Sequence, residues 1–413
     1  MMIGRCIVKN IYYNVRTTAD VKIARYSTIE KVIEISNEVK NALHTGKPIV
    51  ALESTIITHG MPYPMNLKVA KQVEKVVRDN DCVPATIAIV NGIPKIGLND
   101  NDLELLAQAD PKSVIKASRR DISYAIHNKL SAGTTVAGTL TLANLVGLTI
   151  FATGGIGGVH RGAESTMDIS ADLQCLSQIP ITTVCAGIKS ILDIQKSLEV
   201  LETLSVPVIS LGTTTLPAFF TNDSRIKSPY TVQNEIDIAR MMLINKSMGL
   251  GAGMIVAAPN PNPGDSVEIQ NAIDKSLKEA NEQNIHGSAL TPFILARVQE
   301  LTHGKSLDAN VSLILNNAKV ASIIALEYNK LANSKVTKSN NNINNNRINN
   351  NIDYNKKHKQ HTNTTVDVVV VGGAVADFIT KIETKLLLGS SNPGSMTSSY
   401  GGVGRNVAQW LGI

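Results

Sequence analysis

From residue 28 onward, apolar residues recur first at helical spacing and then at strand spacing. Residues 29–43 carry apolar side chains at helical spacing, and Gly46-Lys47-Pro48 ends that pattern. Residues 66–79 repeat it, with Val69, Val73, Val76 and Val77 facing inward. Short apolar runs bounded by turn residues separate such segments and predict buried strands. These runs are residues 49–52, 85–90, 149–152, 182–185, 206–209 and 253–257.

Strands that alternate with helices of this length predict an α/β fold, in which a largely parallel central sheet is covered by helices in an α/β/α arrangement. A last helical stretch, residues 308–331, closes this region, so the predicted α/β domain spans residues 28–333. Residues 340–351 then contain nine asparagines in twelve positions. Such a segment buries too little apolar surface to offset the entropy of ordering, so residues 334–364 are predicted to be a disordered linker.

The net charge of +6 lies in two segments outside the predicted domain. Residues 1–27 hold five Lys/Arg against one acid, and residues 334–365 hold six against one. The rest of the chain is therefore slightly acidic. A nucleic-acid binder carries its positive charge as a patch on a folded face, so no nucleic-acid polymer is expected as a partner.

Cysteine usage and the N-terminal segment suggest the compartment. The four cysteines show no C-x-x-C spacing, which disfavours a disulfide framework or a zinc site and fits a reducing compartment. No uninterrupted apolar run reaches the ~18–20 residues of a membrane helix, so no membrane association is expected. Residues 1–27 are basic and acid-poor, which is typical either of a mitochondrial transit peptide or of a tail on a cytosolic protein. The expected localisation is therefore cytoplasmic or mitochondrial.

Glu53 begins a polar stretch directly after the predicted strand 49–52. This position is the carboxyl end of a strand, where α/β proteins place their ligands. A carboxyl group buried there could act as a general acid or base, because burial raises its pKa toward neutrality. The alternative is a surface or helix-capping glutamate.

Residues 153–162 form a glycine-rich stretch after the strand 149–152. Its backbone N–H groups could bind anionic oxygens, although dinucleotide and P-loop spacings are both absent. Asp168 and Asp172, together with His160, have the donor types that a hard divalent cation prefers. A turn followed by a helix start is the alternative explanation of these three residues.

Lys189 follows the strand 182–185 and Gly187. Most lysines lie on solvated helix faces, so this position is unusual. Partial desolvation would lower the pKa of its amine and allow it to form a Schiff base with a sugar aldehyde. The alternative is a lysine at a helix start that pairs with Asp193.

Together these stretches resemble the pseudouridine-5'-phosphate glycosidase family, also called pseudouridylate synthase or indigoidine-synthase-A-like, over roughly residues 30–332. The motifs ALESTIITHGMPYP, KASRRD, AGTTVAGT, FATGGIGGVHRGA, MDISADL, CAGIKSILD and LTPF occur in the family's order. The resemblance implies reversible cleavage of the C–C glycosidic bond of pseudouridine 5'-phosphate to uracil and ribose 5-phosphate. It also implies one Mn²⁺ per subunit and a homotrimer.

The resemblance also assigns residues to roles. Glu53 matches the proton donor, Lys189 the Schiff-base lysine and Asp168 the metal ligand. The matching or neighbouring substrate-binding candidates are Lys116, Thr134, Thr135, Val136, Ser170, Ala171 and Asp172, with His160 and Asn310 as further pocket candidates. A C–C glycosidic bond has no leaving heteroatom to protonate, so the two-carboxylate scheme of ordinary glycosidases does not transfer, and an iminium on Lys189 would provide the electron sink instead.

Two departures from the family pattern occur: Ile188 replaces a usual alanine, and residues 261–263 read Pro-Asn-Pro where Pro-Ile-Pro is usual. Neither removes a proposed catalytic residue. The alternatives are a catalytically silent sugar-phosphate-binding paralogue and a related pigment-biosynthesis enzyme that acts on a different base.

Residues 365–413 resemble the start of a PfkB or ribokinase-like carbohydrate kinase. Residues 366–373 predict a buried strand that enters a tight turn, residues 371–377 resemble the kinase's first strand, and residues 401–408 resemble its first signature. The sequence stops before the family's catalytic aspartate motif and nucleotide site. We therefore expect an incomplete ribokinase-like fragment without kinase activity.

Overall fold

The computed structural model describes residues 32–285, 287, 290–349, 375–382 and 394–401. The chain divides into two compact units, residues 1–345 and 346–413. The basic segment 1–27 lies outside the described residues, as do residues 350–364 of the predicted linker and nearly all of the kinase-like motifs.

An 11-stranded sheet runs through the first unit. All its pairings are parallel except β3 with β4 and β3 with β6, which confirms the predicted largely parallel sheet. Its main path is β1 (Glu34–Ile35), β4 (Ile93–Ile96), β3 (Val83–Val90), β2 (Ile49–Leu52), β7 (Ile150–Ala152), β8 (Thr182–Cys185), β11 (Met254–Ala257), β9 (Val208–Leu211) and β10 (Tyr230–Val232), and β5 (Ile115–Ala117) and β6 (Ala132–Thr134) branch from β3.

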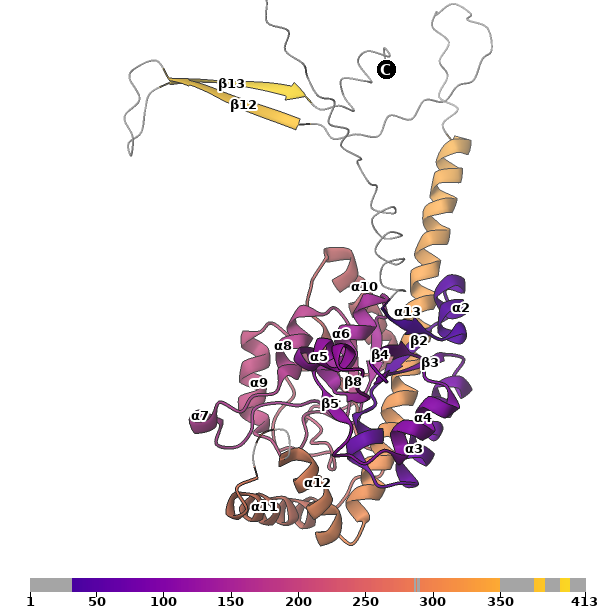
Figure 1. Ribbon diagram of the computed structural model, residues 1–413. Coiled ribbons are helices and arrows are strands. Elements are labelled where there is room, and N and C mark those ends of the chain that lie inside the picture. Colours follow the sequence, from indigo (N-terminus) through magenta and orange to yellow (C-terminus); the bar gives the residue numbers. More distant parts are fainter. Residues whose placement is uncertain (1–31, 286, 288–289, 350–374, 383–393, 402–413) are drawn as a thin grey trace, which may run out of the picture. The chain divides into compact units, whose positions relative to one another are not determined.

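Helices flank this sheet and connect its parallel strands (Figure 1). Their bounds are α2 (Asn37–Thr45), α3 (Met65–Asp79), α4 (Asp100–Gln108), α5 (Ile122–His127), α6 (Val136–Leu145), α7 (Ala163–Thr166), α8 (Ala171–Gln178), α9 (Ile194–Thr203), α10 (Glu235–Met248), α11 (Ser266–Glu282), α12 (Leu290–Leu301) and α13 (Lys305–Asn349). Two short turns, η1 (Ile56–Gly60, π-helical) and η2 (Arg119–Asp121, 3₁₀), complete the set.

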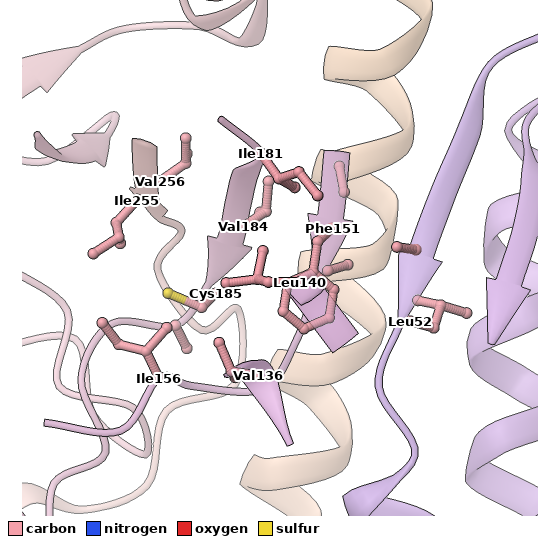
Figure 2. Packing of buried hydrophobic residues seen from close by; sticks show 14 of the residues in the cluster. Leu52, Val136, Leu140, Phe151, Ile156, Ile181, Val184, Cys185, Ile255 and Val256 are labelled. Atoms are coloured by element: carbon pink, nitrogen blue, oxygen red, sulfur yellow. The ribbon is translucent and has the colours of Figure 1, made fainter. Parts of the chain in front are cut away.

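One large apolar core holds the helices against the sheet. Figure 2 shows part of it, where Leu140 of α6 lies beside Phe151 of β7, near Val184 of β8. Phe151 and Leu140 are completely buried. Because β7 and β8 are buried on both faces, their sequences are short continuous apolar runs and not alternations of apolar and polar residues.

The sheet forks where β2 separates from β3. The two strands pair as far as Leu52 and Thr86, after which β6 takes over as the neighbour of Ala88 and Ile89. Two hydroxyl groups span the opening: Ser54 Oγ and Thr134 Oγ1 each donate to the Ile87 carbonyl at 2.6 Å. Ser54 Oγ also accepts from the Thr134 amide at 2.9 Å. The chain can therefore leave the sheet directly after β2 and turn into η1.

The N-terminal end of the first predicted helix was placed wrongly. Residues 34 and 35 form β1, which pairs with β4, and helix α2 starts only at Asn37. Ser36 caps this helix by accepting from the Val39 amide at 3.3 Å. The predicted end is confirmed, because Gly46 terminates α2 in a left-handed conformation with φ 73°.

Helix α13 extends well beyond Leu331, where the sequence pattern predicted its end. The backbone is helical to Asn349, and the linker predicted at residues 334–364 stays a prediction, because residues 350–364 lie outside the described residues. No glycine or proline interrupts residues 305–349. Asparagine disfavours a helix by less than ~0.7 kcal/mol per residue relative to alanine, and a nucleated helix propagates through such residues.

Residues 305–334 of α13 are also long and apolar enough to span a membrane, alone among the helices of the described part of the chain. More than half of their most apolar window is buried inside the protein, as in the core helix of a soluble domain. Leu313, Ala321 and Ile324 are completely buried in the same core as the sheet. The apolar character of α13 is thus explained by packing.

In the second unit, β12 (Val375–Ile382) pairs antiparallel with β13 (Gly394–Gly401). The strand predicted at residues 366–373 lies outside the described residues, as do residues 402–408 of the kinase-like signature. The resemblance to a kinase therefore stays a prediction.

Candidate active site

Four of the residues selected from the sequence line one cavity: Glu53, Lys116, Lys189 and Asn310. They come from four separate parts of the chain, after β2, in β5, after β8 and in α13. The remaining wall is formed by Thr55, Ile56, His59, Gly60, Gly154, Gly155, Phe219, Thr291, Pro292, Leu295 and Ile314. The cavity thus combines two amines and a carboxyl group with a largely apolar wall, as ligand sites do.

Glu53 is held beside Thr153 by the register of the sheet. Leu52 of β2 pairs with Ala152 of β7, so the next residues of both strands are neighbours. Thr153 Oγ1 donates a hydrogen bond to Glu53 Oε1. Burial raises the pKa of Glu53 above its usual value, against the opposing effects of Lys189 and the Thr153 hydrogen bond. A carboxyl group that keeps its proton closer to neutral pH is suited to general acid catalysis.

Lys189 is presented by a tight turn that only glycine can form. Gly187 has φ 94°, and a Cβ there would lie 2.2 Å from the Pro217 carbonyl oxygen. The Lys189 amide donates to the Ile156 carbonyl at 3.2 Å, which ties this turn to the glycine-rich loop after β7. Ile188 is buried in the core and does not line the cavity, so this difference from the family pattern leaves the residues of the cavity wall unchanged.

The alternative explanation of Lys189, an ion pair with Asp193, is not what the structure shows. Asp193 caps α9 by accepting from the Lys196 amide at 3.0 Å, and its other carboxylate oxygen lies 3.3 Å from Lys196 Nζ. Lys189 instead lies in the cavity, where its charge acts on Glu53, Lys116 and His160.

Lys116 lies in the middle of β5, opposite Gly133 of β6. Burial, and secondly the charge of Lys189, lower the pKa of Lys116 to about 8. At neutral pH it is still mostly protonated, because the pH lies below that pKa. Protonated Lys116 therefore supplies positive charge that suits an anionic substrate.

Asp168 and His160 form a second group beside the cavity. The His160 amide donates to the Asp168 carbonyl at 3.0 Å, and His160 Nδ1 lies 3.9 Å from Asp168 Oδ2. Burial lowers the pKa of His160, against the effect of Asp168. No group of three or more His, Cys, Asp or Glu side chains that could hold a metal occurs among the described residues. Asp168 and His160 could thus supply two donors to a cation, and other ligands would complete its shell.

The Asp172 carboxylate connects two backbone segments of the site. Its Oδ1 accepts from the Ala137 amide and its Oδ2 from the Gly157 amide, both at 2.9 Å. It therefore joins the start of α6 to the glycine-rich loop. The alternative explanation, a helix start, also applies in part, because Ser170 caps α8 by accepting from the Asp172 amide.

The other predicted substrate contacts do not belong to the cavity wall. Thr134 is completely buried and its hydroxyl group donates to the Ile87 carbonyl in the sheet fork, and its assignment to substrate binding stays a prediction. Thr135 caps α6. Val136 and Ala171 are the first residues of α6 and α8, where helix amides lack partners within the helix.

Sequence reasoning missed two polar residues next to the reactive groups. Thr153 could have been found from its place directly after a strand, but its pairing with Glu53 depends on β2 and β7 being neighbours. His59 lies in the motif after Glu53, within the π-helical turn that lines the cavity. Its Nδ1 lies 2.7 Å from the Thr58 hydroxyl oxygen. Burial, and secondly Lys116, lower the pKa of His59.

The fold and the site define an α/β enzyme in which a lysine and a buried carboxyl group meet beyond the carboxyl ends of parallel strands. The family model described as indigoidine synthase A like protein matches residues 38–327, which is more than two thirds of the sequence. The chain belongs to the indigoidine synthase A like family.

Relatives in that family share about half of their residues with the chain. A pseudouridine-5'-phosphate glycosidase from Clostridium botulinum is 50% identical over 305 residues, covering 73% of this chain and 99% of the relative. One from Caldanaerobacter subterraneus subsp. tengcongensis is 48% identical over 305 residues, with the same coverage.

Solved structures show the same fold. The prealnumycin C-glycosynthase AlnA, in complex with ribulose 5-phosphate, is similar with a TM-score of 0.68 and 32% identity over 73% of this chain and 99% of that one. An indigoidine synthase A-like protein from Thermotoga maritima has a TM-score of 0.65 and 30% identity over 72% and 97%.

Proposed function

We propose that the chain catalyses reversible cleavage of pseudouridine 5'-phosphate to uracil and ribose 5-phosphate through a Schiff base on Lys189. The observation that carries this proposal is the convergence of Glu53, Lys116 and Lys189 on one cavity. Relatives that are about half identical over almost their whole length and named for this activity support it. The similarity to a C-glycosynthase supports the same bond class.

The proposed chemistry divides one difficult cleavage into easier steps. The ribose ring opens as the C1'–O4' bond breaks and the free amine of Lys189 bonds to C1', and the proton that the amine gives up goes to O4', which becomes a hydroxyl group. Glu53 then protonates uracil C5. The C1'–C5 electron pair leaves with the base, and the lysine nitrogen lone pair forms the C1'=N iminium. Water hydrolyses this iminium, which releases ribose 5-phosphate and regenerates the amine.

The other groups of the cavity orient the substrate. Protonated Lys116 would bind an anionic or electron-rich group of the sugar phosphate. Asn310 is almost completely buried and its Oδ1 has no hydrogen-bond partner among the described residues. An unpartnered buried acceptor favours a donor on the ligand, and uracil offers ring N–H groups of that kind.

We further propose that Asp168 holds Mn²⁺, with His160 as a second donor. A carboxylate oxygen and an imidazole nitrogen suit this cation, and two protein donors leave the other positions to water or substrate. When bound, Mn²⁺ would supply positive charge that offsets the anionic substrate. Three other proposals rest on the sequence alone: the homotrimer on the family resemblance, the fragment at residues 365–413 on its resemblance to a PfkB-like kinase, and the cytoplasmic or mitochondrial location on the basic segment 1–27.

Substrate discrimination tests the proposed reaction. We expect the purified chain to release uracil from pseudouridine 5'-phosphate in the presence of Mn²⁺, and not from uridine 5'-phosphate, because only the C–C bond requires the lysine electron sink. Chromatography of the released base measures both reactions. Equal turnover of the two nucleotides would indicate an ordinary nucleosidase. A different base accepted in place of uracil would favour a pigment-type enzyme.

Metal removal tests the assignment of Asp168. Chelation is expected to abolish uracil release and Mn²⁺ to restore it, because the bound cation would add positive charge opposite the anionic substrate. Asp168→Asn should weaken Mn²⁺ binding measured by calorimetry, since an amide oxygen carries no charge. Asp274→Asn, at a carboxylate that pairs with Arg161, provides the control and should leave Mn²⁺ affinity unchanged. Full activity after exhaustive chelation would exclude the metal from the reaction.

A further inference from the structure

Asn317 of α13 is completely buried and hydrogen-bonds the backbone at the end of β7. Its Nδ2 lies 2.8 Å from the Thr153 carbonyl oxygen and 3.2 Å from the Gly154 carbonyl oxygen, and it donates to both. These carbonyls follow β7 directly, where the chain leaves the sheet. The Gly154 carbonyl also accepts from the Ala186 amide after β8 at 2.9 Å, so the extended strand pairing holds it as well, whereas the Thr153 carbonyl accepts from Asn317.

The same face of α13 forms part of the cavity wall. Asn310, Ile314 and Asn317 are spaced by four and three residues, so they lie on one face of the helix. Asn310 and Ile314 line the cavity. A Cβ added to Gly154 would lie 3.2 Å from Ile314 Cγ1, which shows how closely α13 packs against the backbone after β7.

Thr153 is fixed on both sides by these contacts. Its amide donates to the Val184 carbonyl of β8 at 3.0 Å, and its carbonyl accepts from Asn317. Together the two bonds set the orientation of the peptides on either side of the Thr153 Cα. The direction of the Thr153 hydroxyl group follows from that orientation, and this hydroxyl group donates to Glu53 Oε1.

We propose that Asn317 is a positioning residue for the proton-transferring carboxyl group of Glu53, acting through the backbone and hydroxyl group of Thr153. This inference rests on the proposed function, in which Glu53 transfers protons. Asn317 itself does not line the cavity, so it touches no substrate in this proposal. Its Oδ1 is buried without a hydrogen-bond partner among the described residues, which indicates that the side chain acts through its Nδ2 donor and not through its acceptor.

The test compares Asn317→Ala, Thr153→Val and the double variant in the cleavage of pseudouridine 5'-phosphate across pH. Each single variant is expected to lower kcat about tenfold or more with KM unchanged, because the general acid is misoriented. The alkaline limb of kcat should move up by about one pH unit, since a carboxylate that loses a donated hydrogen bond binds its proton more tightly. The kcat of the double variant should resemble that of Thr153→Val, because both substitutions interrupt the same chain of contacts from Asn317 through Thr153 to Glu53.

Asn329→Ala is the matched control. Asn329 lies on the same helix and also donates its Nδ2 to a backbone carbonyl, that of Gly46 at 2.7 Å, on an exposed surface. It should retain the wild-type pH profile. If Asn317→Ala does not fold, Asn317→Ser replaces it, because serine keeps a polar group and loses only the reach to the two carbonyls.

Two results would overturn the proposal while leaving the proposed function intact. One is an active wild-type enzyme whose Asn317 variants keep the wild-type alkaline limb. The other is a double variant whose kcat loss is the product of the two single losses. Absence of uracil release by the wild-type enzyme under all conditions is a different outcome, because it would reject the proposed function itself.

Discussion

Lys189→Ala and Lys189→Arg are expected to lose turnover of pseudouridine 5'-phosphate by about a thousandfold or more, because they remove the nucleophile. The arginine variant keeps the charge, but a guanidinium cannot deprotonate to attack a carbon centre. Borohydride added with ribose 5-phosphate should trap a covalent adduct on Lys189 in the wild-type enzyme. Mass spectrometry of the digested protein locates that adduct.

Lys196 provides the control for this experiment. It lies in α9 and forms exposed ion pairs with Glu164 and Asp193, away from the cavity wall. Lys196→Arg should retain turnover. An active Lys189→Arg enzyme, or an adduct mapped to Lys116, would show that the nucleophile has been assigned to the wrong lysine.

Glu53→Gln is the second variant with a large expected effect. Glutamine keeps the shape of the side chain but cannot donate or accept the proton, so kcat should fall by roughly 10²–10⁴-fold. In the wild-type enzyme, cleavage should decline as pH rises through the raised pKa of Glu53, because the protonated form is the acid. The variant's residual activity should lack that alkaline limb, which pH profiles of kcat measure directly.

Glu53→Gln should lower activity but raise stability at alkaline pH. The pKa of Glu53 is higher in the folded protein than in the unfolded chain, so its contribution to stability is fully present below the unfolded pKa, which is near 4.5, and is lost as pH rises through the folded pKa. Glu53→Gln does not ionise. Its Tm should therefore exceed that of the wild type at alkaline pH, with a smaller difference at acidic pH.

The exposed Glu202→Gln variant is the control, because a substitution on the surface is expected to change Tm little. A Glu53→Gln protein that is less stable than the wild type at every pH would mean that the ionised Glu53 carboxylate stabilises the folded protein. In that case Glu53 would be a structural anion and not a general acid.

Six of the eleven strands of the central sheet (β2, β3, β7, β8, β9 and β11) could be predicted from the sequence because each contains a short apolar run between turn residues, whereas β1, β4, β5, β6 and β10 were not predicted. The order of the strands could not. Glu53 and Lys189 belong to one site because β7 lies between β2 and β8, and nothing local in the sequence encodes that order. The pairing of Thr153 with Glu53 depends on the same long-range choice.

Errors in the local predictions have identifiable physical causes. Residues 29–35 have helical spacing, but pairing of β1 with β4 and the Ser36 cap override it. The helix predicted at residues 308–331 continues to Asn349, because the asparagine tract that follows contains no glycine or proline to end it. The sheet fork, a long-range contact that the local motif does not encode, explains why the Thr134 hydroxyl group faces inward.

The fork between β2 and β3 separates the chain that follows Glu53 from the β3 ladder. In a continuous ladder, moving one residue means shifting the register of the whole strand. The β2–β7 register still fixes Glu53 beside Thr153, but the turn after it is attached to β3 and β6 through the hydroxyl groups of Ser54 and Thr134. Substitution of these two side chains could therefore reshape the cavity wall formed by η1 while every strand keeps its neighbours. The fork makes the substrate pocket easier to diversify than the acid or the fold.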